Sequence, residues 1–212
     1  RGLGDVYKRQ MPFFGIIAIS ATFVVTLGEI DLSFPSIVGI TSLTFGMLLT
    51  STDGNFFISF ALATALGMFA GLVNGLLVTK IGIPSIVATI GTLFFWRGLV
   101  NVISQGSGIA IVDEADGTWH HMIFVDKLFG IIPAQFIWFV VLTGLMQWVY
   151  RYHKFGNHIH FVGDNKASAQ MMGIDVDRVK IIAFVQLGFF SALAGIFTMY
   201  EMLYFWPTQG SG

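Results

Sequence analysis

Three ionisable side chains lie within or beside long apolar stretches of the sequence, where a charge could do chemistry. Arg97 falls in an apolar segment that begins after Pro84, and Glu29 and Asp31 lie in the short connection LGEIDLS between two such segments. A charge inside a membrane is costly, so such residues often line a solute or ion path, or pair with an opposite charge. A structural role is the alternative: Arg97 can reach the surface or bind a carbonyl, and Asp31 can stabilise a helix start.

The common motifs of enzyme catalysis are missing from the sequence. It has no G-x-x-x-x-G-K-S/T phosphate loop, no G-x-S-x-G elbow, no H-E-x-x-H pair and no Cys. His120 and His121, and likewise His158 and His160, could ligate a metal, but their spacing does not place both rings on one helical face. We interpret them as solvated loop residues. We therefore predict no catalytic residue, metal site or cofactor in this chain, and no enzymatic activity of its own.

The composition is that of a membrane protein. Hydrophobic residues make up 55% of the 212 residues and charged residues only 11%, about half the share in soluble domains. The 11 Lys and Arg nearly balance the 12 Asp and Glu, which argues against a nucleic-acid partner. A spanning helix needs about 20 mostly apolar residues, and the alternation typical of barrel strands is missing. We predict an all-α, polytopic transmembrane helical bundle with about six spans, in windows 11–28, 32–52, 54–79, 81–96, 128–150 and 181–200.

The charges between the windows predict an orientation. Residues 150–180 hold five Lys and Arg, whereas residues 104–131 hold four Asp and Glu against a single Lys. By the positive-inside rule the first segment is a cytoplasmic loop and the second an external loop. Lys8 and Arg9 would then lie on the external side, against the rule. We interpret residues 1–10 as a non-native extension and residues 11–212 as the transmembrane domain.

Small residues recur on one face of two predicted spans. Gly67, Gly71 and Gly75 are spaced four residues apart, and Gly195 belongs to a second small-residue face. Such faces allow the backbones of two helices to approach closely in lipid, so we predict that these glycines serve helix packing. We expect the neighbouring Asn74 to form a hydrogen bond with an adjacent helix.

The cytoplasmic segment contains a pattern typical of a short, capped helix. Asn165 can cap the start, Ala167 to Met172 favours a helix, and Gly173 can end it in a left-handed conformation. A two-turn helix with Ala, Met and Gln at its surface, carried between two spans, is suited to insertion into a groove on another protein. A helix resting on the lipid surface is the alternative, but the segment has few large apolar residues for that role.

Several ordered motifs match one known family. In the cytoplasmic segment the matching residues are Phe155, Gly156, Ile159, Gly163, Asn165, Ala169, Gly173 and Ile174. Elsewhere they are Gly28, Ile30, Asp31, Leu32, Ser33 and Ser36; Pro84, Ser85, Ile86, Thr89, Gly91, Arg97 and Gly98; and Ala192 to Gly195, Pro207, Gly210 and Gly212. On these residues the chain resembles the permease subunits of bacterial ABC importers for simple sugars, of the ribose and xylose type, within the branched-chain amino acid and ribose permease superfamily. Glu29 departs from the family pattern, which has Gly there.

The resemblance implies a set of partners. Two permease subunits, identical or different, would form the pathway in the bacterial inner membrane. A separate ABC ATPase, which binds ATP and Mg, would dock on the cytoplasmic loop, and a periplasmic binding protein would deliver a pentose or hexose. The residues implied in docking and coupling are Gly163, Asn165, Ala167, Ala169, Gly173 and Ile174. We expect bulky charged replacements at Ala169 or Gly173 to uncouple transport and leave the protein in the membrane.

Other interpretations stay open at this stage. A branched-chain amino acid permease of the same superfamily would show the same motifs, because span composition does not identify the cargo. A secondary transporter would instead use Arg97, Glu29 or Asp31 for ion coupling. Since the family continues beyond the motif that ends at Gly212, we expect the chain to be a fragment that lacks the C-terminal part.

Overall fold

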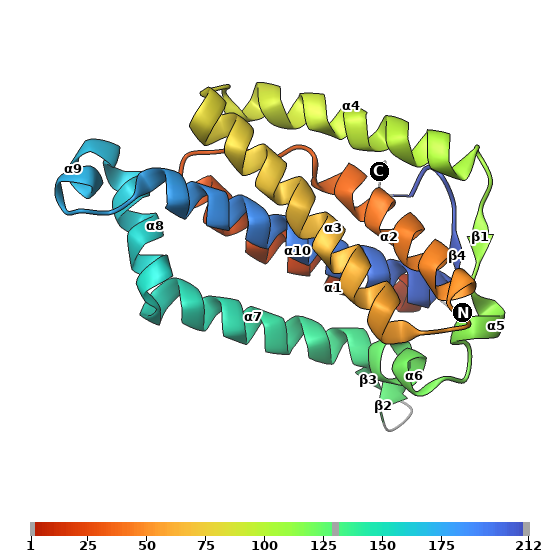
Figure 1. The fold of residues 1–212 in the computed structure, drawn as a ribbon. Coiled ribbons are helices and arrows are strands. Elements are labelled where there is room, and N and C mark those ends of the chain that lie inside the picture. The colour runs from red at the N-terminus through yellow and green to blue at the C-terminus, as the bar shows by residue number, and fades with distance from the viewer. Residues whose placement is uncertain (1–2, 129–131, 210–212) are drawn as a thin grey trace.

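The computed structural model describes residues 3–128 and 132–209, and Gly210 and Gly212 of the last motif lie outside this part. Within it the chain is a helical bundle, as predicted (Figure 1). The six long helices of the described residues correspond to the six apolar windows. They are α1 (Leu3–Thr26), α2 (Phe34–Ser51), α3 (Phe56–Leu76), α4 (Ser85–Ser104), α7 (Ala134–Tyr152) and α10 (Val176–Met202). The turn η1 (Leu77–Ile81) extends α3 with π-helical bonding, and residues 3–10 form the first turns of α1.

The shorter elements lie in the connections. Between α4 and α7 are α5 (Val112–Ala115) and α6 (Trp119–Val125), and between α7 and α10 are α8 (Lys154–Asp164) and α9 (Lys166–Met171). In the described part of the chain, four strands of two residues form two small antiparallel pairs. They are β1 (Ile109–Ala110) with β4 (Tyr204–Phe205), and β2 (Lys127–Leu128) with β3 (Ile132–Pro133).

Helix α10 is the centre of the bundle. It packs most extensively against α3 and also against α2 and α1, while α4 lies on α2 and α7 lies on α1. Figure 1 shows α4 and α7 along opposite sides, with α8 and α9 together at one end and α5 and α6 at the other. The order of the helices thus places the predicted cytoplasmic and external loops at opposite ends of the bundle.

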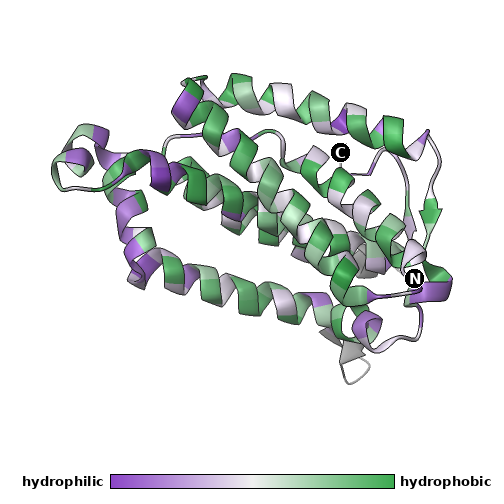
Figure 2. Ribbon diagram, viewed as in Figure 1, coloured by the Kyte–Doolittle hydropathy of each residue, from purple (hydrophilic) through white to green (hydrophobic). Residues whose placement is uncertain are grey.

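The hydropathy of the helices agrees with a multi-pass membrane protein. Among the described residues, four helices are long and apolar enough to cross a membrane, at Phe34–Ser51, Phe56–Ile81, Ser85–Ser104 and Val176–Met202, and Pro12–Thr26 is a shorter apolar helix. Helix α7 also has 19 residues, but two glutamines and Arg151 lower its mean hydropathy. Figure 2 shows apolar residues along the long helices and polar residues gathered around α8 and α9.

Candidate functional site

The predicted short helix α9 forms with the predicted ends. The Asn165 side chain accepts a hydrogen bond from the Ser168 amide at 3.0 Å, and Gly173 has a φ of +79°. The amide of Gly173 donates to Gln170 at 2.9 Å, and that of Ile174 donates to Ala169 at 3.0 Å. Both the N-terminal cap and the left-handed glycine are confirmed, because these two residues satisfy the terminal backbone groups of so short a helix.

The two faces of α9 differ in exposure. Met171 is 85% exposed and Met172 is 61% exposed, and Ala167 is exposed as well. Ala169 is fully buried, and Ile174 is 9% exposed. The expectation of surface alanines is therefore right for Ala167 and wrong for Ala169, whose methyl group packs in the apolar core and holds α9 against the bundle. A bulky charge at Ala169 would disturb this packing as well as any contact with another protein.

Gly163 serves a close backbone contact. A Cβ atom at this position would lie 2.1 Å from the carbonyl oxygen of Thr26, the last residue of α1. The Thr26 hydroxyl in turn lies 2.9 Å from the hydroxyl of Tyr150 on α7. The C-terminal end of α8 can thus reach the end of α1 only because Gly163 has no side chain.

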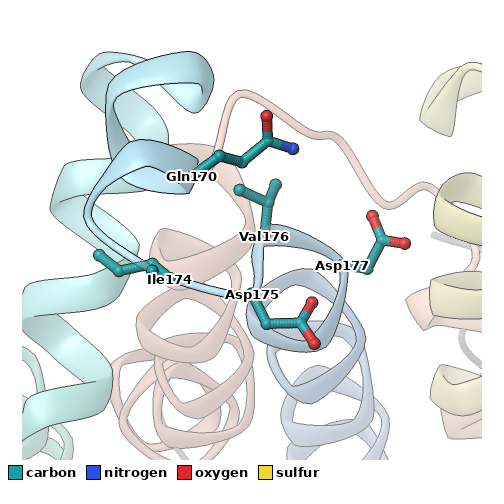
Figure 3. Close-up of a pocket in the computed structure, with 6 residues that line it drawn as sticks. Gln170, Ile174, Asp175, Val176 and Asp177 are labelled. Atoms are coloured by element: carbon teal, nitrogen blue, oxygen red, sulfur yellow. The ribbon is translucent and has the colours of Figure 1, made fainter.

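An open hollow lies beside α9 where the chain enters α10. It has a volume of about 370 Å³ and is lined by Gln170, Gly173, Ile174, Asp175, Val176 and Asp177. Figure 3 shows Gln170 above Val176, with the carboxylates of Asp175 and Asp177 on the α10 side. Asp175 accepts a hydrogen bond from the Arg178 amide at 3.0 Å and caps α10, and Asp177 accepts one from Lys80 at 2.7 Å.

Glu29 lies beneath α9 as the centre of a charged cluster. It is 8% exposed and bonds to Lys180 of α10, and Lys166 of α9 lies 3.7 Å from the same carboxylate oxygen. Burial raises the pKa of Glu29, but the hydrogen bonds from Lys180 and Ser85 and the charges of both lysines outweigh it, so the pKa is below its ordinary value. The proximity of Lys180 lowers the pKa of Lys166.

Asp31 lies in the same connection but faces a neutral polar cluster. Its carboxylate accepts hydrogen bonds from the amide and hydroxyl of Ser33, at 2.6 and 2.7 Å, and from Asn74 at 3.1 Å. Asn74 also accepts a hydrogen bond from Thr92 of α4 at 2.7 Å, which confirms the predicted contact with an adjacent helix. Burial raises the pKa of Asp31.

Arg97 binds backbone carbonyls. Its Nη1 atom donates to Gln209 at 2.9 Å and to Pro207 at 3.3 Å, while the Gln209 side chain donates to Ser42 of α2 at 2.9 Å. This corresponds to the structural alternative for Arg97, because the guanidinium fixes the segment after α10 between α4 and α2.

Comparison with known proteins shows the family. The model of a family described as "Branched-chain amino acid transport system / permease component" matches residues 7–211. The chain belongs to this permease family. The resemblance read from the motifs is therefore confirmed at the level of this permease family.

Two curated relatives show what share of a family member's length this chain matches. This chain is 34% identical over 198 residues to the autoinducer 2 import system permease protein LsrC of Photorhabdus luminescens. The aligned region covers 93% of this chain and 58% of the relative. It is 36% identical over 181 residues to the protein of the same name from Yersinia pseudotuberculosis serotype O:3. That aligned region covers 85% of this chain and 50% of the relative. The permease thus spans about half the length of these relatives. No solved structure matches it.

The four predicted packing glycines of the permease lie at helix contacts. Gly67, Gly71 and Gly75 of α3 face α10, and a Cβ atom at Gly71 would lie 2.2 Å from the carbonyl oxygen of Phe184. Gly195 of α10 faces α2, where a Cβ atom would lie 2.8 Å from the carbonyl oxygen of Val38. Such approaches of backbone to backbone tolerate no side chain.

The four histidines predicted to lie in loops belong to helices instead, His120 and His121 to α6 and His158 and His160 to α8. His120 departs furthest from the prediction of solvated residues. It belongs to α6, is 4% exposed, and its Nδ1 atom lies 2.9 Å from the Tyr200 hydroxyl and 3.0 Å from that of Thr118. Its ring stacks on Phe56 with centroids 5.2 Å apart. Burial and the neighbouring His121 lower its pKa below the ordinary value. Within the described ranges, no three His, Cys, Asp or Glu residues lie close enough together to hold a metal ion.

Two features of the permease near α9 were not predicted. Helix α8 is one, although Phe155, Ile159 and Val162 recur at helical spacing, and the last two are fully buried. The other is the bond between Glu29 and Lys180, which are 151 positions apart. No local pattern indicates a contact at that separation.

Proposed function

We propose that this chain is the transmembrane permease subunit of an ATP-driven ABC importer for a simple, sugar-like solute, and that α9 docks on a separate ATPase. The observation that carries the proposal is α9 itself, in a member of a permease family. It projects from one end of the bundle, its ends are satisfied by Asn165 and Gly173, and it exposes Met171 and Met172. An exposed, flexible thioether packs readily into an apolar groove of another protein.

The proposed orientation places α8 and α9 in the cytoplasm. In support, this end of the bundle carries Arg151, Lys154, Lys166 and Arg178, and the opposite end carries Asp113, Glu114 and Asp116. A second permease subunit would complete the pathway, a periplasmic binding protein would present the solute from the opposite end, and ATP with Mg would bind to the ATPase. The setting would be the bacterial inner membrane.

The cargo proposed first is a pentose, a hexose or autoinducer 2. It is supported by the sugar-type motifs and by the names of the LsrC relatives. A branched-chain amino acid is the second candidate, and the description of the matching family supports it.

Orientation can be tested by cysteine labelling, because residues 1–212 contain no Cys and any Cys elsewhere in the full-length permease can first be replaced by Ser. We expect Met171→Cys in the full-length permease to react with a membrane-impermeant maleimide only when the cytoplasmic side is accessible. Asp116→Cys, at an exposed position in the connection before α6 at the opposite end, is the matched control and should react only from the external side. Labelling with the reverse sidedness would contradict the proposed docking face.

Energy coupling is tested by reconstitution. The full-length permease should co-purify with its ATPase, and vesicles that hold both should take up ribose, autoinducer 2 or leucine only with ATP on the ATPase side and binding protein on the other. The solute that is taken up identifies the cargo class. Uptake by the permease alone, driven by a proton or sodium gradient, would instead show a secondary transporter. The bonds of Arg97 to carbonyls and of Glu29 to Lys180 weigh against that alternative.

A further inference from the structure

The connecting turn of residues 27–33, between α1 and α2, is anchored to α9 on one side. Glu29 bonds to Lys180 of α10 and lies 3.7 Å from Lys166, the first residue of α9. Gly163 at the end of α8 also contacts Thr26 directly before this turn. A displacement of α9 would therefore move or break the ionic contact that Lys166 makes with the turn.

The other side of the connecting turn is anchored to α3 and α4. The amide of Ile30 donates to Ser85 at 3.1 Å, and the amide of Leu32 donates to Thr89 at 3.1 Å. Asp31 continues the contact through Asn74 of α3, which is also bonded to Thr92 of α4. The Ser85 hydroxyl, at the first residue of α4, thus binds the turn.

We infer that the connecting turn transmits the position of α9 to α3 and α4, with Glu29 as the positioning residue on the α9 side and Asp31 on the helix side. A chain of packed side chains and hydrogen bonds can carry such coupling when its members move together. Only the cause of the α9 displacement, the docking of an ATPase, rests on the proposed function. The mechanical link belongs to the permease itself.

A local role for each contact is the competing account. An exposed ion pair such as that of Lys166, whose side chain is 56% exposed, contributes little to stability in general. If the contacts act locally, a change at Lys166 affects α9 alone and leaves the exchange of the Ile30 and Leu32 amides unchanged. If they form one link, a change at Lys166 reaches the amides of Ile30 and Leu32 and has no further effect once Glu29 is changed.

Hydrogen exchange on the full-length permease in lipid nanodiscs separates these accounts. The amides of Ile30 and Leu32 are the reporters, because their partners belong to α4. We expect Lys166→Gln to speed their exchange about two- to fivefold, the range for a pair of this exposure. Glu29→Gln should speed it more, since it leaves the buried Lys180 unpaired. The double variant should exchange no faster than Glu29→Gln alone.

Asp177→Asn is the matched control. It removes the negative charge that pairs with Lys80 at the same end of the bundle, and Asp177 bonds to no residue of the connecting turn in the described contacts. We expect it to leave the exchange of Ile30 and Leu32 unchanged. An unchanged exchange rate in Lys166→Gln, or additive effects in the double variant, would overturn the inference. Lys166→Gln keeps the test valid if Glu29→Gln does not fold, because the Lys166 side chain lies mostly in solvent.

A second measurement keeps the inference distinct from the proposed function. In the assembled importer, Glu29→Gln should still co-purify with the ATPase, because Glu29 is buried behind α9, but solute uptake should fall about two- to thirtyfold, the range for changes in coupling. If no ATPase binds the wild-type permease, the proposed function is wrong. The hydrogen-exchange measurement still tests the link between α9 and α4, because it needs no ATPase. If the ATPase binds and uptake by Glu29→Gln equals that of wild type, the inferred link is wrong.

Discussion

Replacing Gly71 with Ala tests the close contact between α3 and α10. The Cβ atom would lie 2.2 Å from the Phe184 carbonyl oxygen, whereas ordinary contact begins at 3.4 Å. The two backbones would have to separate by roughly 1.2 Å, enough to lose a quarter to a half of the attraction in many atom pairs. Both partners are helix backbone, so no rotamer change can relieve the overlap.

The size of the effect follows from two opposing contributions. Overpacking of this kind costs about 3 kcal/mol, the upper part of its usual range. The greater helix propensity of Ala offsets about 1 kcal/mol. We therefore expect Gly71→Ala to lower the free energy of unfolding by about 2 kcal/mol.

Reversible unfolding by SDS in mixed micelles measures this change. Gly91→Ala is the matched control, because Gly91 also lies in a spanning helix but a Cβ atom there meets nothing within 4 Å. We expect the control to unfold at the wild-type SDS concentration or slightly above it. If Gly71→Ala unfolds together with Gly91→Ala, α3 and α10 do not approach as closely as described.

Three further predictions address the ends of the bundle. Ala167→Arg, on the exposed face of α9, should weaken binding of the ATPase in a co-purification assay without a change in unfolding. His120 has a lowered pKa, so the unfolded chain binds its proton more readily, and stability should fall as the pH drops from about 7.5 to about 5.5. His120→Phe should weaken this dependence in thermal unfolding; an equal dependence in both proteins would contradict burial as its cause. Arg97→Gln should speed hydrogen exchange of the Gln209 amide, which donates to Trp206, because this turn opens more readily once Arg97 no longer holds its carbonyls.

Much of the architecture could be predicted because the membrane imposes it on the sequence. A span must be long, apolar and hydrogen-bonded within itself, so the charge-free windows indicated the long helices directly. The ends of α9 were equally local, because Asn165 and Gly173 act on backbone groups within four residues of themselves. The small-residue spacing of Gly67, Gly71 and Gly75 similarly indicated one face of α3.

The roles of the ionisable side chains were beyond local reasoning. The sequence alone established that Glu29, Asp31 and Arg97 lie next to apolar segments, and that a charge there needs a partner. Tertiary structure decided the partners: Lys180 for Glu29, Ser33 and Asn74 for Asp31, and two backbone carbonyls for Arg97. Packing likewise turned Ala169 inward and enclosed His120. The physical reason is that periodicity and capping depend on neighbours along the chain, whereas burial and ion pairing depend on which distant helices meet.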